Sequence, residues 1–319
     1  MKLVFCGTPA FAVPTLETLL AAGHEIALVV SQPDRPVGRA QQMTAPLVKQ
    51  AALAAGLAVT QPEKIRANAE FRAQLESIVP DAIVVVAYGR IIPPWMLALP
   101  RLGCINLHGS LLPKYRGAAP IQWAVAMGDA VTGNTTMLLE EGLDTGPILL
   151  QQTVEIKPDD TAVELFNVLA GAGAPLVAET LAGLDAGAIH PQPQNHEGAT
   201  FAPLLDREDG RIDFARRSAH EIYNRWRGFQ PWPGAFTTLE GKKIIVHRMC
   251  VAGSDVTDSG HAAPGQIRTE HDRIFVACAG GTWLELLELQ PEGKKRLATA
   301  EFLRGNQVHS TARLGSTSS

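Results

Sequence analysis

Two hydrophobic patterns alternate along the first 188 residues of the chain. Short runs rich in Val, Ile and Leu predict buried strands over residues 2–7, 25–31, 81–89, 103–108, 134–140 and 146–156. Longer stretches with helical spacing predict helices over residues 10–23, 45–56, 68–79, 119–128 and 161–187. Continuous apolar strands that alternate with helices are typical of a mostly parallel sheet covered on both faces. The pattern therefore predicts an α/β domain.

Turn residues mark the ends of the first predicted helices. Thr8 and Pro9 are expected to supply the N-cap and the first residue of the helix over 10–23. Gly23 and Gly56 are expected to end the first two helices, because glycine adopts the left-handed conformation common there.

The pattern changes near residue 188. The next stretch is rich in proline and has no periodicity, which is typical of a linker. Beyond it, short β segments are separated by Gly-Gly and Pro-Gly pairs, which predicts a small barrel. We therefore expect a catalytic domain over residues 1–188, a linker over 189–206 and a β-barrel domain over 207–319.

Composition supports an ordinary two-domain protein. The chain has 319 residues, 46% hydrophobic and 19% charged, with a net charge of −4. Its four cysteines are scattered and form no CxxC pair, which predicts free thiols and no metal site. The N-terminus does not resemble a signal peptide, and no window suggests a membrane span. We expect a cytoplasmic protein without a membrane partner.

Charge is divided unevenly between the two halves. Residues 1–200 hold 12 Lys and Arg against 18 Asp and Glu, a balance of −6. Residues 201–319 hold 16 against 14, a balance of +2. The positive half is a slight indication that the second domain meets a polyanion.

The apolar segment 103–108 ends in two polar side chains. Asn106 and His108 stand two residues apart on an extended segment, so they point to the same face. Both lie at its carboxyl end, just before Gly109, where ligands bind in open α/β sheets. The spacing alone leaves two readings open: a ligand site, or polar side chains satisfied by backbone groups at a strand end.

A second strand is followed by an acidic turn. Asp144 lies between Gly142 and Gly146, after the apolar strand 134–140. Because successive parallel strands end at one edge of a sheet, we expect Asp144 to lie near His108, where its charge favours the imidazolium. Asp is also common in turns for local reasons, and that alternative stays open.

An Asn amide, a cationic His and an Asp suit attack of a nucleophile on a carbonyl. They can stabilise an oxyanion and move protons during the attack. The sequence contains no GxSxG motif and no cysteine beside a histidine, so direct transfer is favoured over an acyl-enzyme. The first turn, GTPAFA, lacks the later glycines of the GxGxxG motif, which disfavours dinucleotide binding.

Several motifs resemble those of formyltetrahydrofolate-dependent formyltransferases. The longest are NLHGSLLPKYRGAAPIQWA and GLDTGPIL, and shorter ones extend to LELLELQPEGKKRL near the end. The resemblance spans residues 1–310. It implies a Rossmann-like catalytic domain with a mostly parallel sheet, followed by a C-terminal barrel of the OB type. The implied reaction transfers the formyl group of 10-formyltetrahydrofolate to the α-amine of methionine on initiator tRNA, releasing tetrahydrofolate.

The same resemblance implies roles for individual residues. Asn106 and protonated His108 would stabilise the oxyanion, while Asp144 would hold His108 charged and assist proton transfer. The co-substrate would be bound by one loop, one strand end and one turn, namely Ser110, Leu111, Leu112 and Pro113, then Val86, Tyr88 and Gly89, then Leu139 and Glu141. The strand end and the turn would act largely through backbone groups. Tyr88 is equally well explained as a core aromatic.

The long loop after residue 32 is implied to reach the tRNA acceptor stem. It carries Arg35 and Arg39, but Gln41 and Gln42 replace the family's usual basic pair. In the second domain, a basic face would hold tRNA phosphates through Lys242, Lys243 and Lys294, with Arg225, Arg227, Arg248, Lys295 and Arg296 as further candidates. We expect a monomer that needs no metal.

Three alternatives remain open from the sequence. A related formyltransferase could act on a small amine, such as glycinamide ribonucleotide or an amino-sugar nucleotide. A multidomain formyltetrahydrofolate hydrolase or dehydrogenase is disfavoured, because this chain has no room for a further catalytic domain. An RNA-binding protein without activity is disfavoured by the intact Asn106, His108 and Asp144 set.

Overall fold

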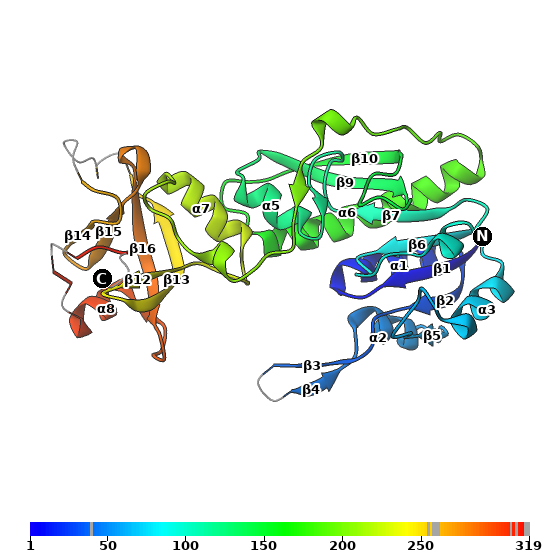
Figure 1. The fold of residues 1–319 in the computed structure, drawn as a ribbon, viewed down its shortest axis with the longest axis horizontal. Coiled ribbons are helices and arrows are strands. Elements are labelled where there is room, and N and C mark those ends of the chain that lie inside the picture. The colour runs from blue at the N-terminus through cyan, green and yellow to red at the C-terminus, as the bar shows by residue number, and fades with distance from the viewer. Residues whose placement is uncertain (39–40, 254–255, 257–261, 307, 310–311, 316–319) are drawn as a thin grey trace. The chain divides into compact units, whose positions relative to one another are not determined.

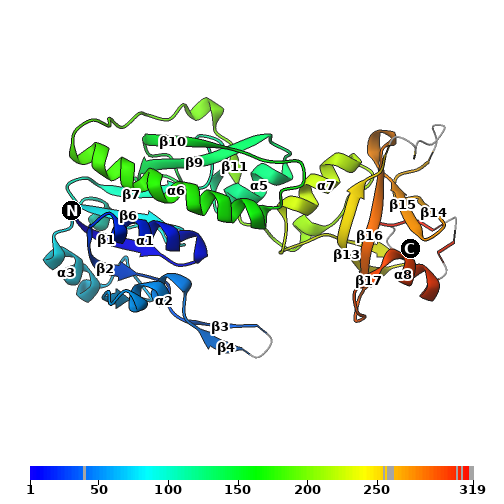
Figure 2. The ribbon, with the colours of Figure 1, turned by 180° about the vertical axis from the view of Figure 1, so that it is seen from behind.

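The chain forms two compact units in a computed structural model that describes residues 1–38, 41–253, 256, 262–306, 308–309 and 312–315 (Figures 1 and 2). The first unit comprises Met1–Ile121, Val131–Ile156 and Glu164–Pro203. The second comprises Gln122–Ala130, Lys157–Val163 and Leu204–Ser319.

A seven-stranded sheet forms the centre of the first unit. In spatial order its strands are β10 (Ile148–Glu155), β9 (Val131–Leu138), β7 (Cys104–His108), β6 (Ala82–Val86), β1 (Lys2–Gly7), β2 (Glu25–Val30) and β5 (Val59–Thr60). The strands from β7 to β5 are all parallel to one another, whereas β9 is antiparallel to both β7 and β10. The predicted mostly parallel α/β sheet is confirmed.

Helices cover both faces of this sheet (Figures 1 and 2). They are α1 (Val13–Ala21), α2 (Leu47–Ala54), α3 (Ala69–Ile78), α4 (Pro94–Leu97), α5 (Pro120–Ala126), which begins in this unit, and α6 (Ala162–Asp185). Phe71 of α3 and Met96 of α4 share a buried cluster with Cys104 of β7. On the opposite face, Asn134 of β9 donates a hydrogen bond of 2.8 Å to the carbonyl of Leu169 in α6. Alternate residues of each strand therefore face different helices.

The first helix does not begin as predicted. A 3-10 turn, η1 (Ala10–Ala12), precedes α1, and Thr8 caps neither element. Instead the Thr8 hydroxyl donates to the carbonyl of Tyr88, 3.1 Å away, in the turn after β6. The capping prediction was wrong because an acceptor distant in sequence lies beside Thr8.

Helix α6 corrects the expectation that no stretch of the chain is long and apolar enough to cross a membrane. By length and composition it could cross a membrane, with 24 residues and a mean hydropathy of 1.4 in its most apolar window. Half of that window is buried inside the protein, and Thr180 within it hydrogen-bonds Thr136 of β9 at 2.8 Å. Such burial against a sheet is typical of a core helix.

The second unit contains an antiparallel sheet in the order β12 (Phe236–Leu239), β13 (Lys242–Val251), β16 (Trp283–Pro291), β15 (Arg273–Ala277) and β14 (Ile267–Glu270), with β17 (Leu297–Ala298) paired to β16. Helices α7 (Ala219–Gly228) and α8 (Thr299–Gly305) pack against it. Leu314 bridges to Leu239 of β12, and Arg313 bridges to Gln266 beside β14. The C-terminal segment thus joins the two edge strands, which closes the sheet as expected for a barrel.

Residues 189–203 lie along the first unit, although the proline-rich composition predicted a linker. Gln192 exchanges two backbone hydrogen bonds of 2.8 Å with Ile148 of β10. Strand β11 (Phe201–Ala202) pairs in parallel with β8 (Arg116–Gly117). This segment therefore contributes structure to the first unit as far as Pro203.

Candidate active site

The polar end of β7 lies at the centre of the site. Asn106 and His108 point to the same face of the sheet, since Met137 and Thr135 of β9 are their cross-strand partners. His108 is buried, with 6% of its surface exposed, whereas Asn106 is half-buried. The structure thus places both side chains together, as the alternation predicts.

Backbone contacts fix the orientation of the His108 ring. Its Nε2 lies 2.9 Å from the carbonyl oxygen of Tyr115. Because a carbonyl can only accept, Nε2 carries a proton and donates it to this bond. The other ring nitrogen, Nδ1, lies 3.8 Å from Oδ2 of Asp144, too far for a hydrogen bond. Nδ1 is therefore the nitrogen that faces the acidic side chain.

Asp144 reaches His108 by a route that differs from the predicted one. Strand β9 is antiparallel to β7, so its carboxyl end pairs with Ile105, at the start of β7. The turn after β9 then returns toward His108, and Leu139 packs against the same core cluster as Cys104. The predicted proximity is correct, but the expected convergence of parallel strand ends was wrong.

The Asp144 carboxylate is also held by the backbone. Its Oδ2 accepts a hydrogen bond of 2.8 Å from the amide of Gly117. Asp144 itself has a φ of 51°, a left-handed conformation that is uncommon outside glycine. The position of this carboxylate therefore depends on local strain that neighbouring contacts must offset.

The loop from Ser110 to Pro113 is clamped by side chains of β9 and β10. The hydroxyl of Thr135 donates to the carbonyl of Ser110 at 2.7 Å and accepts from the amide of Leu112 at 3.1 Å. The side chain of Gln151 donates to the carbonyl of Leu112 at 2.9 Å. Ser110 uses its own hydroxyl within the loop, donating to Lys114 at 2.6 Å. Leu111 and Pro113 are half-buried.

Neither clamping residue was identified from the sequence. Thr135 and Gln151 lie in ordinary strand patterns, and nothing local to them points to the loop. Only the pairing of β9 with β7 and β10 brings them beside it.

The end of β6 presents backbone rather than side chains. Val86 is buried in the sheet, and Ala87 and Gly89 are exposed at the turn. The Tyr88 side chain is 2% exposed within the core cluster, and burial raises the pKa of its hydroxyl. Tyr88 can therefore contribute only its backbone to a ligand. On the facing turn, Leu139 is half-buried and Glu141 is exposed.

The predicted tRNA loop forms a hairpin of β3 (Arg35–Val37) and β4 (Gln42–Thr44). Arg35 is exposed on it, whereas Arg39 lies outside the described residues. Lys49, which follows the hairpin, forms an ion pair with Asp34 at 2.9 Å. Arg35 is thus the described cation that the hairpin itself presents.

In the second unit, three predicted lysines lie at one end of the sheet. Lys242 and Lys243 begin β13, and the turn carrying Lys294 joins them through a bond of 3.0 Å from the Glu292 amide to the Lys243 carbonyl. Lys242 and Lys294 are exposed, while the Lys243 ammonium lies 3.9 Å from the Phe236 ring centroid. We call these three residues the lysine end.

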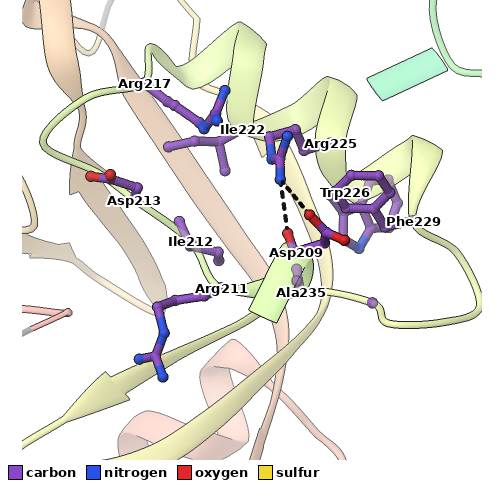
Figure 3. Close-up of a pocket in the computed structure, with 12 residues that line it drawn as sticks. Asp209, Arg211, Ile212, Asp213, Arg217, Ile222, Arg225, Trp226, Phe229 and Ala235 are labelled. Carbon is purple, nitrogen blue, oxygen red and sulfur yellow. Dashed lines mark hydrogen bonds and ion pairs between the residues drawn. The ribbon is translucent and has the colours of Figure 1, made fainter. Parts of the chain in front are cut away.

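Four of the arginines predicted for the basic face are bonded within the second unit. Arg248 and Arg296 both pair with Glu288. Arg227 is 4% exposed and donates to the carbonyl of Asp160 at 2.7 Å. Figure 3 shows Arg225 pointing toward Asp209, whose carbonyl accepts a bond of 3.1 Å. The proposal of Arg225 and Arg227 as phosphate contacts was therefore wrong, because both side chains are bonded within their own unit.

Cysteine chemistry is not supported at the site. Cys104 lies on β7 near Asn106, but burial raises the pKa of its thiol to about 12, so it stays protonated and a poor nucleophile. Within the described ranges, no group of three His, Cys, Asp or Glu side chains could hold a metal ion.

Comparisons with known proteins show what the chain is similar to. The formyl transferase family model matches residues 1–181, and the model of the formyl transferase C-terminal domain matches residues 204–307. A methionyl-tRNA formyltransferase of Acidobacterium capsulatum is 66% identical over 315 residues, covering 99% of this chain and 100% of that protein. One of Koribacter versatilis is 56% identical over 319 residues, covering 100% of both.

A solved structure shares the fold at lower identity. The sugar 3N-formyltransferase WlaRD, crystallised with dTDP and 5-N-formyl-THF, matches with a TM-score of 0.65 and 18% identity. The match covers 92% of this chain and 99% of that one. At this identity the likeness supports the two-domain architecture and nothing further.

Proposed function

Since the chain belongs to the methionyl-tRNA formyltransferase family, we propose that it transfers the formyl group of 10-formyltetrahydrofolate to the free α-amino group of methionyl initiator tRNA. The product is N-formylmethionyl-tRNA for translation initiation. The observation that carries the proposal is the meeting of Asn106, His108 and Asp144 in one site of a chain that matches such enzymes over its full length.

The residues fit the folate co-substrate in chemical type. The clamped loop at Ser110–Pro113 and the exposed backbone at Ala87 and Gly89 offer polar backbone groups near the catalytic side chains. The half-buried Leu111 and Leu139 add apolar surface for a flat ring. When bound, 10-formyltetrahydrofolate supplies the formyl carbon, whose carbonyl oxygen becomes negative as the amine attacks.

The protein's side chains then have separate tasks. Asn106 donates its amide N–H to the formyl oxygen, and His108 donates from Nδ1, since Nε2 is occupied by Tyr115. Donation from Nδ1 while Nε2 keeps its proton requires the imidazolium, which the nearby Asp144 carboxylate stabilises. Asp144 also accepts the proton that the amine loses and returns it to N10 of the folate as the bond between the formyl carbon and N10 breaks and tetrahydrofolate leaves.

Further proposals concern the partner and the assembly. The lysine end and Arg35 hold phosphates of the tRNA and carry no base specificity. We propose that the protein acts as a monomer, because Asn106, His108 and Asp144 of a single chain already form the catalytic set. We place it in the cytoplasm, where charged tRNA is used.

A parallel transfer assay tests the function. With 10-formyltetrahydrofolate as donor, we expect rapid formylation of initiator methionyl-tRNA and much slower formylation of elongator methionyl-tRNA and glycinamide ribonucleotide. Faster transfer to the ribonucleotide, or to an amino-sugar nucleotide, would replace the proposed acceptor.

Salt should affect the two substrates differently. Because each neutralised phosphate releases counterions, tRNA affinity should fall steeply as salt rises, whereas folate affinity should change little. The Lys242→Gln, Lys294→Gln double variant should reduce the magnitude of the slope of log tRNA affinity against log salt concentration by about two, because each lost phosphate contact reduces it by about one. Lys64→Gln, at an exposed lysine of the first unit, is the matched control. Equal and shallow slopes for both substrates would contradict the proposed phosphate contacts.

Loss of the loop clamp should weaken co-substrate binding. Thr135→Val removes the hydroxyl that bonds Ser110 and Leu112, at a cost of about 1–3 kcal/mol in local stability. We expect the Kd for 10-formyltetrahydrofolate to rise about tenfold, which corresponds to 1.4 kcal/mol. Thr136→Val, at the next residue of β9, faces α6 instead and serves as the control. Equal effects of the two substitutions on Kd would argue against the clamp.

A further inference from the structure

We propose that Gln194, held by the buried guanidinium of Arg116, is a positioning residue that fixes the turn carrying Asp144. The inference rests on the proposed function, because it concerns how the catalytic carboxylate is kept beside His108. It assigns a task to the segment between the two matched family regions, which end at residue 181 and begin at residue 204.

The carboxamide of Gln194 uses all its hydrogen-bonding positions. Its Nε2 donates to the carbonyl of Asp144 at 2.8 Å and to that of Gly146 at 2.7 Å. Its Oε1 accepts from Arg116, from Nε at 3.1 Å and from Nη2 at 2.6 Å. The side chain is 5% exposed. Carbonyls only accept and a guanidinium only donates, so the amide has one orientation here.

Arg116 explains how this amide stays in place. Its side chain is 4% exposed and lies in β8, which is paired to β11 of the same segment as Gln194. Its Nη2 also contacts Nδ1 of His196 at 3.1 Å. The next residue, Gly117, donates its amide to the Asp144 carboxylate. One short strand therefore holds the catalytic carboxylate directly and its backbone through Gln194.

The turn needs such support. Residues 140–143 are exposed, and Asp144 has a left-handed φ of 51°. A conformation of this kind persists where surrounding contacts fix it. Gln194 bonds two carbonyls of the turn, at Asp144 and two residues later, so these bonds hold both the strained residue and the chain that follows it.

Replacement of the neutral amide by a carboxylate of the same size distinguishes positioning from simple packing. In Gln194→Glu the carboxylate can still accept from Arg116, but it cannot donate to the carbonyls of Asp144 and Gly146. The variant thus keeps the volume of the side chain and its contact with Arg116, while it removes the two hydrogen bonds to the turn. We expect the Asp144 carboxylate to move away from Nδ1 of His108.

The test is a double-mutant cycle on the full-length protein, with kcat and KM measured for formyl transfer to initiator methionyl-tRNA. Gln194→Glu should lower kcat by about 10- to 100-fold and change the KM for 10-formyltetrahydrofolate by less than about threefold. In an Asp144→Asn background the same change should cost less than about threefold, because Gln194 acts through Asp144. Gln192→Glu is the matched control: it adds the same charge at an exposed side chain that bonds only its own segment.

A loss of equal size in both backgrounds would overturn the proposal, as would full activity of Gln194→Glu. If Gln194→Glu does not fold, the cycle is run with Gln194→Asn, whose amide is one methylene too short to bond Arg116 and the turn together. Failure of the proposed function is seen separately, as absence of transfer by the unsubstituted protein.

Discussion

The His108→Ala variant is expected to transfer formyl groups about 10²-fold more slowly than the unsubstituted protein, or worse. Removal of the ring takes away an oxyanion donor, and each such group typically contributes 10²–10³ in rate. The loss should appear in kcat, since the interaction forms only as the formyl oxygen becomes negative. A single-turnover measurement with saturating 10-formyltetrahydrofolate would isolate the chemical step.

Folding must be controlled in this variant. His108 is buried and donates to the Tyr115 carbonyl, so its loss should cost about 1–3 kcal/mol of stability. Thermal unfolding and folate binding would show that the site persists, and His220→Ala, at an exposed histidine, should behave like the unsubstituted protein. Near-normal turnover of a folded His108→Ala variant would contradict the mechanism.

The Asp144→Asn variant is expected to lose about 10²-fold in rate while keeping the geometry of the turn. An amide oxygen can still accept from Gly117, so the side chain should stay in place. What it loses is the negative charge that stabilises the imidazolium and accepts a proton. The rate loss would therefore report the contribution of the negative charge of Asp144 rather than a displacement of its side chain.

Asp185→Asn provides the matched control for that substitution. Asp185 lies at the end of α6 and pairs with Arg101 on the surface, where such pairs contribute little. The Asp185→Asn substitution should change the rate of formyl transfer by less than about twofold. If Asp144→Asn were equally mild, Asp144 would have only a turn-forming role.

The sequence predicted those features that depend on local periodicity. Alternation along β7 placed Asn106 and His108 on one face, and apolar runs located most strands within two residues. The strand pattern placed Asp144 near His108 and the motif resemblance implied its role, but the physical reason given for its position was wrong. Periodicity does not reveal whether a neighbouring strand is parallel, and the antiparallel β9 requires the turn to fold back.

Residues that act through tertiary contacts could not be predicted in this way. Thr135 and Gln151 clamp a loop from strands whose patterns are ordinary. Gln194 lies in a proline-rich stretch that reads as a linker, and nothing in its local sequence predicts burial. Arg225 and Arg227 carried charges that looked available for phosphates, yet carbonyls distant along the chain accept from both.

The attachment of residues 189–203 to the first unit determines where hybrid enzymes can be joined. A chimaera that takes only the C-terminal part of its second unit from a relative, with the crossover after Ala188, would import a foreign partner for Arg116 and a foreign β11. A crossover after Pro203 keeps Gln194 with the strand and the turn it bonds. Exchange of the C-terminal part between relatives therefore has its natural junction at residue 203, fifteen residues beyond the point that composition suggests.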